Sequence, residues 1–374
     1  MADSKPRTKR RTAPPPTADA AMADELIRWF HAGKRDLPWR RTRDPYAIWV
    51  SEVMLQQTTV AAVRPYYERF LARFPTVQAL AEAPEADVLR HWAGLGYYSR
   101  CRNLHAAARQ MVERFAGRVP DTVEDLLSLP GVGRYTAGAV SSFAYGVRAP
   151  ILDTNVARVL ARVFRIDGDP REPAVSRRLW EIAERLVPES DPGGFNGAVM
   201  ELGATVCSPA DPRCLLCPIR ERCGAFAEGR PTAWPQLRPR RRPVEVHEVA
   251  VVVECGGRYL LARRRPGDLW AGMWEFPRYP VESGETADAA ALRVAADKLA
   301  VSAAAVVELP TVRHGVTFRR IRLDARLIRT DRPPARAEGY AEHRRLDLIE
   351  AAALPHSSPQ ARMLRNVAAV GSAG

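Results

Sequence analysis

The chain has 374 residues and a formal net charge of +13, with 56 Lys and Arg residues against 43 Asp and Glu residues. A chain of this length exceeds what a single core usually holds, so we expect two domains. The positive charge favours a polyanionic partner, either nucleic acid or an acidic membrane surface. The sequence has no apolar run of about 18 residues that would span a membrane, and no signal peptide is evident. We therefore expect a cytoplasmic protein.

Residues 1–21 are rich in prolines, alanines and basic residues. The basic residues are Lys5, Arg7, Lys9, Arg10 and Arg11. This composition buries too little apolar surface to offset the entropy lost on ordering, so we predict a disordered basic tail. Two roles are open for it: an arm that contacts phosphates, or a solvated terminus with no role.

Residues 22–227 show a helical pattern almost throughout. Apolar residues recur at intervals of three and four, as in Leu26, Ile27 and Phe30, and strand-like alternation is nearly absent. Pro, Gly and Asp interrupt the pattern at the spacing of short links between helices. We therefore predict an all-α domain of two lobes.

Residues 228–246 break the helical pattern and form a predicted linker. Between residues 229 and 243, prolines and arginines replace the apolar periodicity. Such a segment suits an extended linker that also follows a phosphate backbone.

Residues 247–374 are expected to form an α+β domain. Two strands are predicted at residues 248–253 and 258–263, on either side of a turn at Cys255, Gly256 and Gly257. A helix is predicted at residues 287–299, which gives the mixture of strands and helices of this class.

Four of the six cysteines lie within 17 residues, with the spacing C-x6-C-x2-C-x5-C. They are Cys207, Cys214, Cys217 and Cys223. Four thiolates on one loop suit either a tetrahedral zinc ion or a 4Fe-4S cluster, and spacing alone leaves both open. Cys101 and Cys255 stand apart and are expected to be ordinary small apolar residues.

Residues 129–138, LPGVGRYTAG, place Gly131 and Gly133 in a tight turn before a predicted helix. Such a turn exposes successive backbone N–H groups and binds a phosphate, although it also serves as a simple link between helices. Asp153 follows this helix, ahead of the cysteines.

Glu52 lies in the string WVSEVMLQQT, where its neighbours are Trp49, Val50, Val53 and Met54. An apolar setting raises the pKa of a carboxyl group, so that the group holds a proton near neutral pH. A solvent-facing helix glutamate is the alternative when the string is taken by itself.

Taken together, these motifs resemble the endonuclease III superfamily of helix-hairpin-helix DNA glycosylases, and the string around Glu52 closely resembles the MutY family. The resemblance implies a 4Fe-4S cluster on the four cysteines. It also implies that Glu52 protonates adenine N7 and that Asp153 stabilises or briefly captures the oxocarbenium centre. The other catalytic positions correspond to Tyr135, Asn155 and Arg40.

The resemblance extends to the DNA. Gln57 and Tyr97 match residues that probe the duplex beside the orphaned base, and Gly131 and Gly133 match the hairpin. The implied partner is double-stranded DNA with adenine opposite 8-oxoguanine or guanine, bound by a monomer during base excision repair. In a bacterium the protein would act at the nucleoid.

Tyr135 stands where superfamily members that also cut the DNA backbone carry a lysine. A phenol forms no imine with the abasic sugar, so base removal without efficient strand cleavage is predicted.

The C-terminal region resembles the Nudix-like domain with which MutY proteins recognise 8-oxoguanine. A working Nudix box needs adjacent glutamates to hold magnesium, whereas Asp297 and Lys298 stand at this place, so hydrolysis is not expected.

Three residues depart from the family pattern. Thr317 and Phe318 occupy a loop that is usually Ser-His and contacts 8-oxoguanine, so a hydroxyl is kept and an imidazole is lost. Gly197 stands where many relatives place Glu or Gln near the adenine.

Two other functions are open. One is an endonuclease III-like glycosylase and lyase that acts on oxidised pyrimidines, and the missing lysine at position 135 counts against it. The other is a noncatalytic DNA-binding protein with a structural or redox cluster, and the presence of both Glu52 and Asp153 counts against it.

Overall fold

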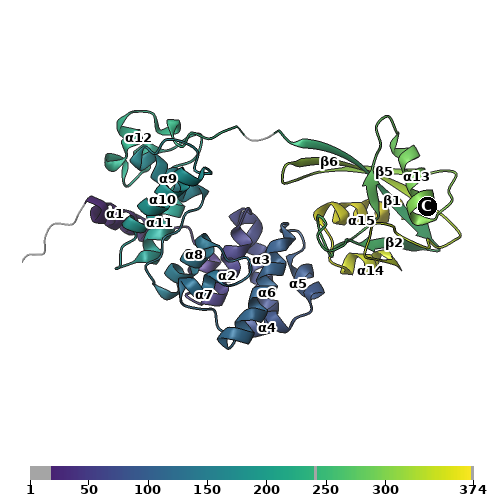
Figure 1. Cartoon of the computed structure of the whole chain (residues 1–374), viewed down its shortest axis with the longest axis horizontal. Helices are drawn as coiled ribbons and strands as arrows, with labels where there is room; N and C mark the ends of the chain where they lie inside the picture. The colour runs from purple at the N-terminus through teal and green to yellow at the C-terminus, as the bar shows by residue number, and fades with distance from the viewer. Residues whose placement is uncertain (1–17, 240–241, 372–374) are drawn as a thin grey trace, which may run out of the picture. The chain divides into compact units, whose positions relative to one another are not determined.

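A computed structural model describes residues 18–239 and 242–371 of the chain (Figure 1). Within these ranges every strand follows residue 243, so the predicted order of a helical region before an α+β region is confirmed. The predicted tail lies outside the described residues up to residue 17, and its last four residues begin helix α1 (Ala18–Gly33). Among the described residues, no helix is long and apolar enough to cross a membrane.

The chain divides into two compact units. The first unit comprises residues 1–52 and 119–238, and the second comprises residues 53–118 and 239–374. The division passes through helix α2 (Pro45–Leu55), so the predicted helical region contributes to both units. The predicted linker at residues 228–246 stays a prediction.

The first unit carries most of the predicted site residues on helices. Besides α1 and the start of α2, it contains η1 (Pro38–Arg40), α7 (Val123–Leu127), α8 (Arg134–Tyr145), α9 (Thr154–Phe164), α10 (Pro173–Leu186), α11 (Pro192–Thr205), η2 (Cys214–Leu216), η3 (Arg220–Arg222), α12 (Gly224–Ala227) and η4 (Pro231–Ala233). Helices α1, α9, α10 and α11 lie side by side in Figure 1. Their apolar residues, including Leu26, Leu160 and Leu179, share one core whose burial stabilises the unit.

Helices α8 and α9 are placed by two local features of the sequence. Asp153 caps α9, because its carboxylate accepts a hydrogen bond from the backbone N–H of Val156 at 2.7 Å. Gly138 of α8 faces the segment before α9, where a Cβ would lie 2.2 Å from the carbonyl oxygen of Pro150. A glycine at this position therefore lets α8 approach the segment that positions Asp153.

The second unit begins with four helices. They are α3 (Val60–Arg73), α4 (Val77–Glu82), α5 (Glu85–Trp92) and α6 (Tyr98–Phe115). Thr59 and Thr76 cap α3 and α4 through their side-chain oxygens. Phe70 packs against Phe74 and Trp92, with ring centroids 4.9 and 5.9 Å apart. This aromatic cluster joins α3 to the end of α5, the helix that precedes α6 in the chain.

The rest of the second unit is a seven-stranded sheet. Its strands are β1 (Val244–Cys255), β2 (Arg258–Arg263), β3 (Trp274–Glu275), β4 (Arg278–Pro280), β5 (Val307–Val316), β6 (Arg319–Arg329) and β7 (Glu342–Leu346). The predicted pair of strands is confirmed as β1 and β2, which are antiparallel. Strand β1 also pairs in parallel with β6, and β5 and β6 form a hairpin whose tip is Thr317 and Phe318.

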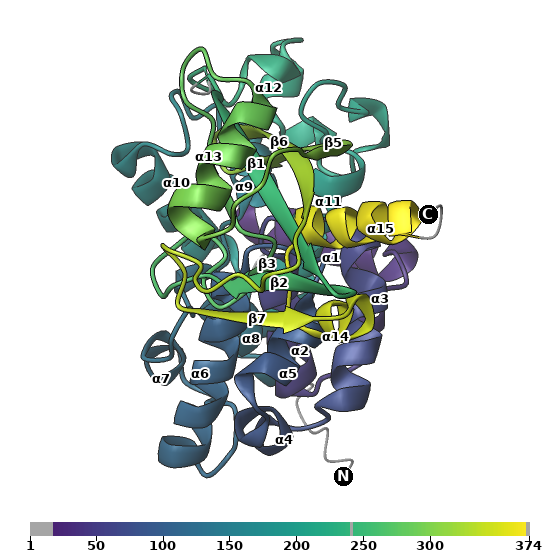
Figure 2. The ribbon, with the colours of Figure 1, turned by 90° about the vertical axis from the view of Figure 1, so that its right-hand side faces the viewer.

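Three helices complete this part of the second unit. They are α13 (Ala287–Leu299), α14 (Leu348–Ala353) and α15 (Ser358–Gly371). Figure 2 shows α13 and α15 on opposite sides of β1 and β6. Alternate residues of β1 serve the two faces, since Val249 and Val251 pack in the core of α13 while Ala250 and Val252 pack in the core of α15. The predicted helix at residues 287–299 is confirmed as α13.

Candidate active site

Glu52 and Tyr135 meet in the first unit although 83 residues separate them in the chain. The Tyr135 hydroxyl donates a hydrogen bond to Oε2 of Glu52 at 2.8 Å. Glu52 is 4% exposed. Burial raises its pKa to about 7, the negative charge of Asp153 adds to this rise, and the hydrogen bond from Tyr135 and the charge of Arg40 oppose it. A carboxyl group with this pKa is about half protonated at neutral pH.

The enclosure of Glu52 follows from the composition of α2. The buried residues of this helix include Tyr46, Ala47, Ile48, Trp49, Val50, Val53 and Met54. Such a helix has no solvent-facing side over these residues, so its one acidic side chain is buried with its apolar neighbours.

Asp153 and Asn155 lie at the start of α9. The Asn155 amide donates to Oδ2 of Asp153 at 3.0 Å, while the backbone N–H of Val156 donates to Oδ1. Burial raises the pKa of Asp153, and these two hydrogen bonds oppose the rise. The N-terminus of a helix favours a negative charge, so the position suits a carboxylate that faces a developing cation.

Arg40 is held by a carboxylate that the sequence analysis missed. Glu201 on α11 is buried, and it accepts hydrogen bonds from Arg35 at 2.7 and 2.8 Å and from Arg40 at 2.8 Å. Although burial by itself would raise the pKa of Glu201, the two guanidinium groups hold it at about 2. Glu201 therefore stays ionised and fixes both arginines.

One face of α11 carries residues that lie beside Tyr135 and Arg40. Gly197, Met200 and Glu201 are three and four residues apart and so share a face. The sulfur of Met200 lies 3.7 Å from the Tyr135 hydroxyl. A Cβ at Gly197 would lie 2.7 Å from the ring of Phe30, so an aromatic ring occupies the space of a side chain at this position. No pattern in the sequence pairs Phe30 with Gly197.

Arg158 joins this region to the cysteine loop. Its guanidinium donates to Oδ1 of Asn155 at 2.8 Å, to the carbonyl oxygen of Gly203 at 2.8 Å and to that of Cys207 at 2.8 Å. Because Asn155 in turn donates to Asp153, a continuous chain of hydrogen bonds runs from the loop to the carboxylate. The sequence analysis missed Arg158 because its partners are mostly backbone atoms.

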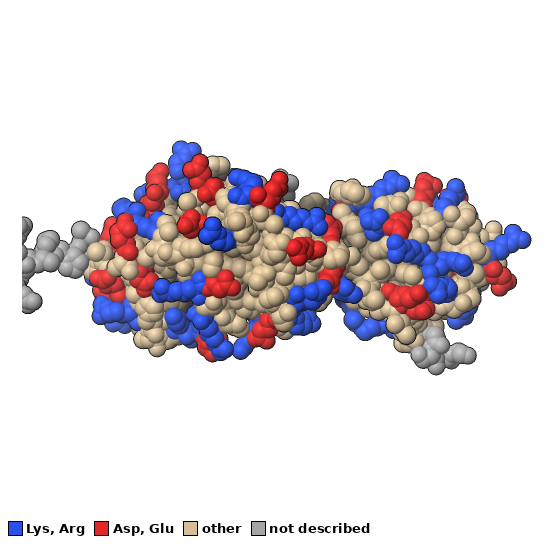
Figure 3. Space-filling model, turned by 90° about the horizontal axis from the view of Figure 1, so that it is seen from below, with Lys and Arg blue, Asp and Glu red and all other residues tan. Residues whose placement is uncertain are grey.

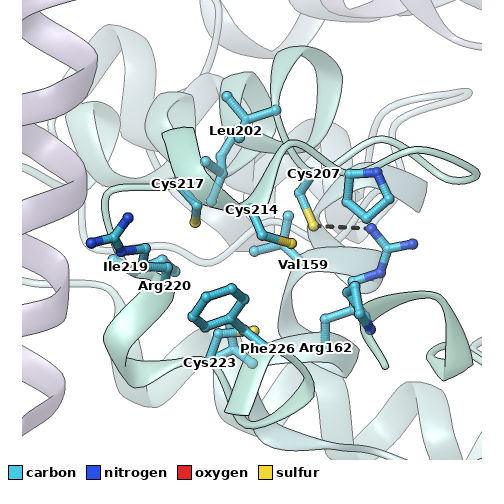
Figure 4. Close-up of a pocket in the computed structure, with 14 residues that line it drawn as sticks. Val159, Arg162, Leu202, Cys207, Cys214, Cys217, Ile219, Arg220, Cys223 and Phe226 are labelled. Atoms are coloured by element: carbon cyan, nitrogen blue, oxygen red, sulfur yellow. Dashed lines mark hydrogen bonds between the residues drawn. The ribbon is translucent and has the colours of Figure 1, made fainter. Parts of the chain in front are cut away.

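The four cysteines of the motif surround one pocket (Figure 4). Cys207, Cys214, Cys217 and Cys223 all line it, together with apolar residues that include Val159, Leu202 and Phe226. All four thiols are free. The buried Arg162 donates a hydrogen bond to the sulfur of Cys207 at 3.2 Å, which places a positive charge beside the four thiols.

The arrangement of the thiols bears on the kind of metal group they fit. Among the described residues, no three His, Cys, Asp or Glu side chains come close enough together to hold a single metal ion. A tetrahedral zinc ion requires all four sulfurs at about 2.3 Å from one point. A 4Fe-4S cluster instead takes one thiolate on each of four iron atoms, and four thiols around one pocket suit a metal group of either kind.

The predicted phosphate-binding turn is exposed in the first unit. Gly131 and Gly133 are solvent-exposed, while Val132 between them is buried. Gly131 has a φ of +74°, a conformation that favours glycine, and Gly133 precedes the first residue of α8. The turn thus presents the backbone at the N-terminus of a helix, as phosphate binding requires.

Gln57 and Tyr97 belong to the second unit, where both are exposed. Both have left-handed backbone conformations, with φ values of +56° and +49°. Non-glycine residues adopt this conformation at an energetic cost, and such strain collects at functional sites.

Thr317 and Phe318 form the exposed tip of the β5–β6 hairpin in the second unit. Thr317 has a φ of +53°, and its hydroxyl donates to the carbonyl oxygen of Val316 at 2.7 Å. The Phe318 side chain is 55% exposed. The tip therefore presents an aromatic ring to solvent, beside a hydroxyl that already has an acceptor.

Helix α13 carries the residues compared with a Nudix box. Arg293 pairs with Glu285 through hydrogen bonds of 2.8 and 2.9 Å, and Asp297 is exposed. Glu285 is therefore engaged by a guanidinium group.

In Figure 3, basic and acidic side chains are interspersed on the face in view.

Comparisons with known proteins agree with the motifs. Residues 50–185 match the family described as HhH-GPD superfamily base excision DNA repair protein, and residues 248–366 match the NUDIX domain. The chain is 42% identical over 314 residues to the adenine DNA glycosylase of Rattus norvegicus, with 70% of this chain and 61% of the relative covered. It is 34% identical over 255 residues to that of Buchnera aphidicola subsp. Schizaphis graminum, with 68% and 74% covered.

The chain spans less than two thirds of the length of the rat relative. Among solved structures, a thermostable thymine-DNA glycosylase matches with a TM-score of 0.51 and 30% sequence identity, over 56% of this chain and 97% of that protein.

Proposed function

The chain belongs to the adenine DNA glycosylase family, and we propose that it removes adenine from mispaired double-stranded DNA. The observation that carries the proposal is Glu52, a buried acid with a pKa of about 7 that accepts a hydrogen bond from Tyr135. Asp153, a second and half-buried carboxyl group, lies near enough for its charge to raise the pKa of Glu52.

The proposed reaction uses the two carboxyl groups in different protonation states. The neutral carboxyl group of Glu52 gives its proton to N7 of adenine, which makes the base a better leaving group. The bond between the base and C1′ breaks, its electron pair goes to the base, and the Asp153 carboxylate stabilises the oxocarbenium ion. Water then adds to C1′, and the proton that it releases returns Glu52 to the neutral form.

The other predicted catalytic residues support these two groups. Tyr135 donates to Glu52, and Asn155 donates to Asp153. Arg40, which Glu201 holds, supplies a positive charge that keeps the pKa of Glu52 from rising further. The target nucleotide has to leave the base stack to reach a carboxyl group that is 4% exposed.

We also propose that the reaction stops at base removal. Tyr135 offers a hydroxyl where a lyase needs an amine, and a phenol forms no imine with the abasic sugar. The hydroxyl is already committed to Glu52, and burial raises its own pKa, so it is a neutral hydrogen-bond donor.

The four cysteines fit a 4Fe-4S cluster, which we propose as the resident cofactor. Cys207, Cys214, Cys217 and Cys223 line one pocket, and their spacing resembles that of the cluster loop of the endonuclease III superfamily. When bound, the cluster would tie α11 to the loop that follows it. Purified protein should contain four irons and four sulfides per chain, whereas one zinc per chain would contradict the proposal.

The preferred substrates that we propose are duplexes with adenine opposite 8-oxoguanine or guanine. Gly131 and Gly133 suit a phosphate contact, and Gln57 and Tyr97 suit contacts within the duplex. Thr317 and Phe318 form the proposed reader of the opposite base. We expect a monomer that acts on chromosomal DNA, at the nucleoid if the source is a bacterium.

The test is a cleavage assay on a duplex with a single adenine opposite 8-oxoguanine. Breaks at the adenine that appear only after alkali treatment would support the proposed function. Breaks without alkali would indicate a lyase, and the absence of both, together with tight binding, would indicate a noncatalytic DNA-binding protein.

A further inference from the structure

A buried arginine, Arg100, lies near the start of α6 and is 8% exposed. Its Nη1 donates to the carbonyl oxygens of Val53 and Met54, each at 2.8 Å, and to that of Gln56. Its Nη2 donates to the hydroxyl of Thr58 at 3.0 Å and to the carbonyl oxygen of Gly96 at 3.3 Å. One guanidinium group thus binds two separate loops.

The acceptors in these loops directly precede the two proposed duplex contacts. Gln56 is followed by Gln57, and Gly96 is followed by Tyr97. Gln57 and Tyr97 are both exposed and both left-handed, with φ values of +56° and +49°. Such backbone conformations persist only where the surroundings hold them.

The same guanidinium also packs between aromatic rings. Its central carbon lies 5.4 Å from the ring centroid of Trp92 and 5.4 Å from that of Tyr97. Trp92 itself donates to the carbonyl oxygen of Gly96 at 3.1 Å. Arg100 therefore contacts the Tyr97 ring as well as the peptide group before it, and this double contact restricts how that side chain points.

Arg100 also ends helix α2, which carries Glu52. The last carbonyl groups of a helix have no partner within it, and a positive charge there is favourable. Arg100 satisfies those of Val53 and Met54. The backbone next to Gln57 and Tyr97 is thereby tied to the C-terminal end of α2.

Only an arginine suits this position. Its planar fork directs several N–H groups at once toward acceptors on different sides. A lysine ends in one nitrogen with three N–H groups, which is fewer donors than the five acceptors that Arg100 binds. Burial lowers the pKa of Arg100 to about 10, so the group still carries its charge at neutral pH.

We propose that Arg100 is a positioning residue that holds Gln57 and Tyr97 in the conformation with which both enter the duplex beside the target base. The inference rests on the proposed function, since it concerns how the duplex is opened for base removal. Holding both side chains before DNA binds removes the entropy that ordering them would otherwise cost.

The test compares Arg100→Met and Arg100→Lys with the parent in single-turnover removal of adenine opposite 8-oxoguanine. Both variants are expected to lose roughly 10-fold to 100-fold in rate, because misplaced contacts with the substrate cost this much. Arg109→Met is the matched control: Arg109 lies on the same helix, is exposed, and donates to the carbonyl oxygen of Ala81 at 3.3 Å. Its rate is expected to stay within about twofold of the parent.

A double-mutant cycle separates positioning from a merely structural role. If Arg100 acts through Tyr97, then Arg100→Met in a Tyr97→Ala background adds little further loss. Fluorescence of 2-aminopurine placed beside the mispair gives a second readout, since it rises when the base unstacks. This rise is expected to be weaker for both Arg100 variants than for Arg109→Met.

Full additivity of the two losses, or an Arg100→Lys variant as active as the parent, would overturn the inference. If Arg100→Met fails to fold, as thermal unfolding shows, Arg100→Lys carries the test because it keeps the charge. If the parent itself removes no adenine, the proposed function fails, and the fluorescence comparison still decides whether Arg100 controls the opening of the duplex.

Discussion

The proposed catalytic carboxyl groups of the first unit and the hairpin tip of the second unit differ in how firmly their neighbours hold them. Glu52 is 4% exposed and receives a hydrogen bond from Tyr135, and Asp153 receives two. At the tip, Phe318 is 55% exposed, and the Thr317 hydroxyl donates to the backbone of the adjacent residue.

This difference separates two kinds of function. A buried acid needs a fixed environment, because its pKa depends on every charge and dipole around it. A side chain that meets another molecule acquires its environment from that molecule, so little in the free protein constrains it. Substitutions are therefore expected to have large effects at Glu52 and small effects at Phe318.

The largest expected effect is that of Glu52→Gln on catalysis. The amide keeps the size of the side chain but is unable to supply a proton to the base. We expect the single-turnover rate of adenine removal to fall by about 10²-fold to 10⁴-fold, the range for loss of a general acid. Glu68→Gln, at an exposed position of α3, is the control and should leave the rate unchanged. A Glu52→Gln variant with the rate of the parent would contradict the proposed mechanism.

The second prediction concerns how Glu52 affects stability as pH changes. Its pKa is about 7 in the folded protein, against an ordinary 4.5, so the folded state binds this proton more tightly than the unfolded chain does. The contribution of Glu52 to the free energy of unfolding therefore falls as pH rises from about 4.5 to about 7, and then levels off. The cost of the ionised form is about 3 kcal/mol.

Glu52→Gln removes this cost. Relative to the parent, the variant should gain about 2 kcal/mol or more in free energy of unfolding between pH 5 and pH 8. Denaturant unfolding of both proteins at the two pH values measures this difference, in which the other titrating groups largely cancel. A difference that does not change with pH would show that Glu52 is ionised in the folded protein at pH 5 as readily as in water.

Site residues could be predicted from the sequence where a pattern of nearby residues indicates their role. The apolar residues that flank Glu52 leave a solvent-facing glutamate open, and the resemblance of the whole string to the MutY family singles it out, whereas the cysteines stand out by their spacing. Helix α13 was predicted at residues 287–299, the bounds that the structure gives it, and the structure shows that Thr286 caps it. In each of these cases the signal in the sequence comes from residues that are close along the chain.

Residues whose partners are distant in the chain were missed. Glu201 binds Arg35 and Arg40 across more than 160 residues, and Arg158 binds the backbone of Cys207. Their only signal in the sequence is a charged residue among apolar ones on a helix, a pattern that solvated helices also show. The parallel pairing of β1 with β6 is equally distant and was not predicted.

Gly197→Gln is expected to have an effect between those at Glu52 and at Phe318. The position is buried, as Glu52 is, but it carries no side chain. The new Cβ would lie 2.7 Å from the Phe30 ring, so the ring has to move. We expect a loss of about 1 to 3 kcal/mol in free energy of unfolding, as for other overpacked cores, together with slower adenine removal. Thermal unfolding and single-turnover assays measure the two effects.

Phe30→Ala provides the compensating change for Gly197→Gln. In the double variant the glutamine side chain has room, so the two losses in stability should be less than additive. Additive losses would show that Phe30 and Gly197 act independently, despite the approach of the ring to this position.

The smallest expected effect is that of Phe318→His at the hairpin tip. The side chain is exposed, so the free energy of unfolding should change by no more than about 0.5 kcal/mol. The imidazole adds a polar group, and one hydrogen bond to the opposite base is worth about 1 kcal/mol, so the preference for adenine opposite 8-oxoguanine over guanine should rise by less than about tenfold. Parallel single-turnover assays on the two duplexes measure the ratio.

Phe318→Leu is the matched control, because it removes the aromatic ring without adding a polar group. If this variant changes the ratio as much as Phe318→His does, the ring reads the opposite base by stacking and the loss of the imidazole is secondary. If either variant lowers the free energy of unfolding by several kcal/mol, the tip is part of the packed structure. In that case Phe318, like Glu52, would be held by its neighbours within the folded chain. The two positions would then differ only in the chemical role of the side chain.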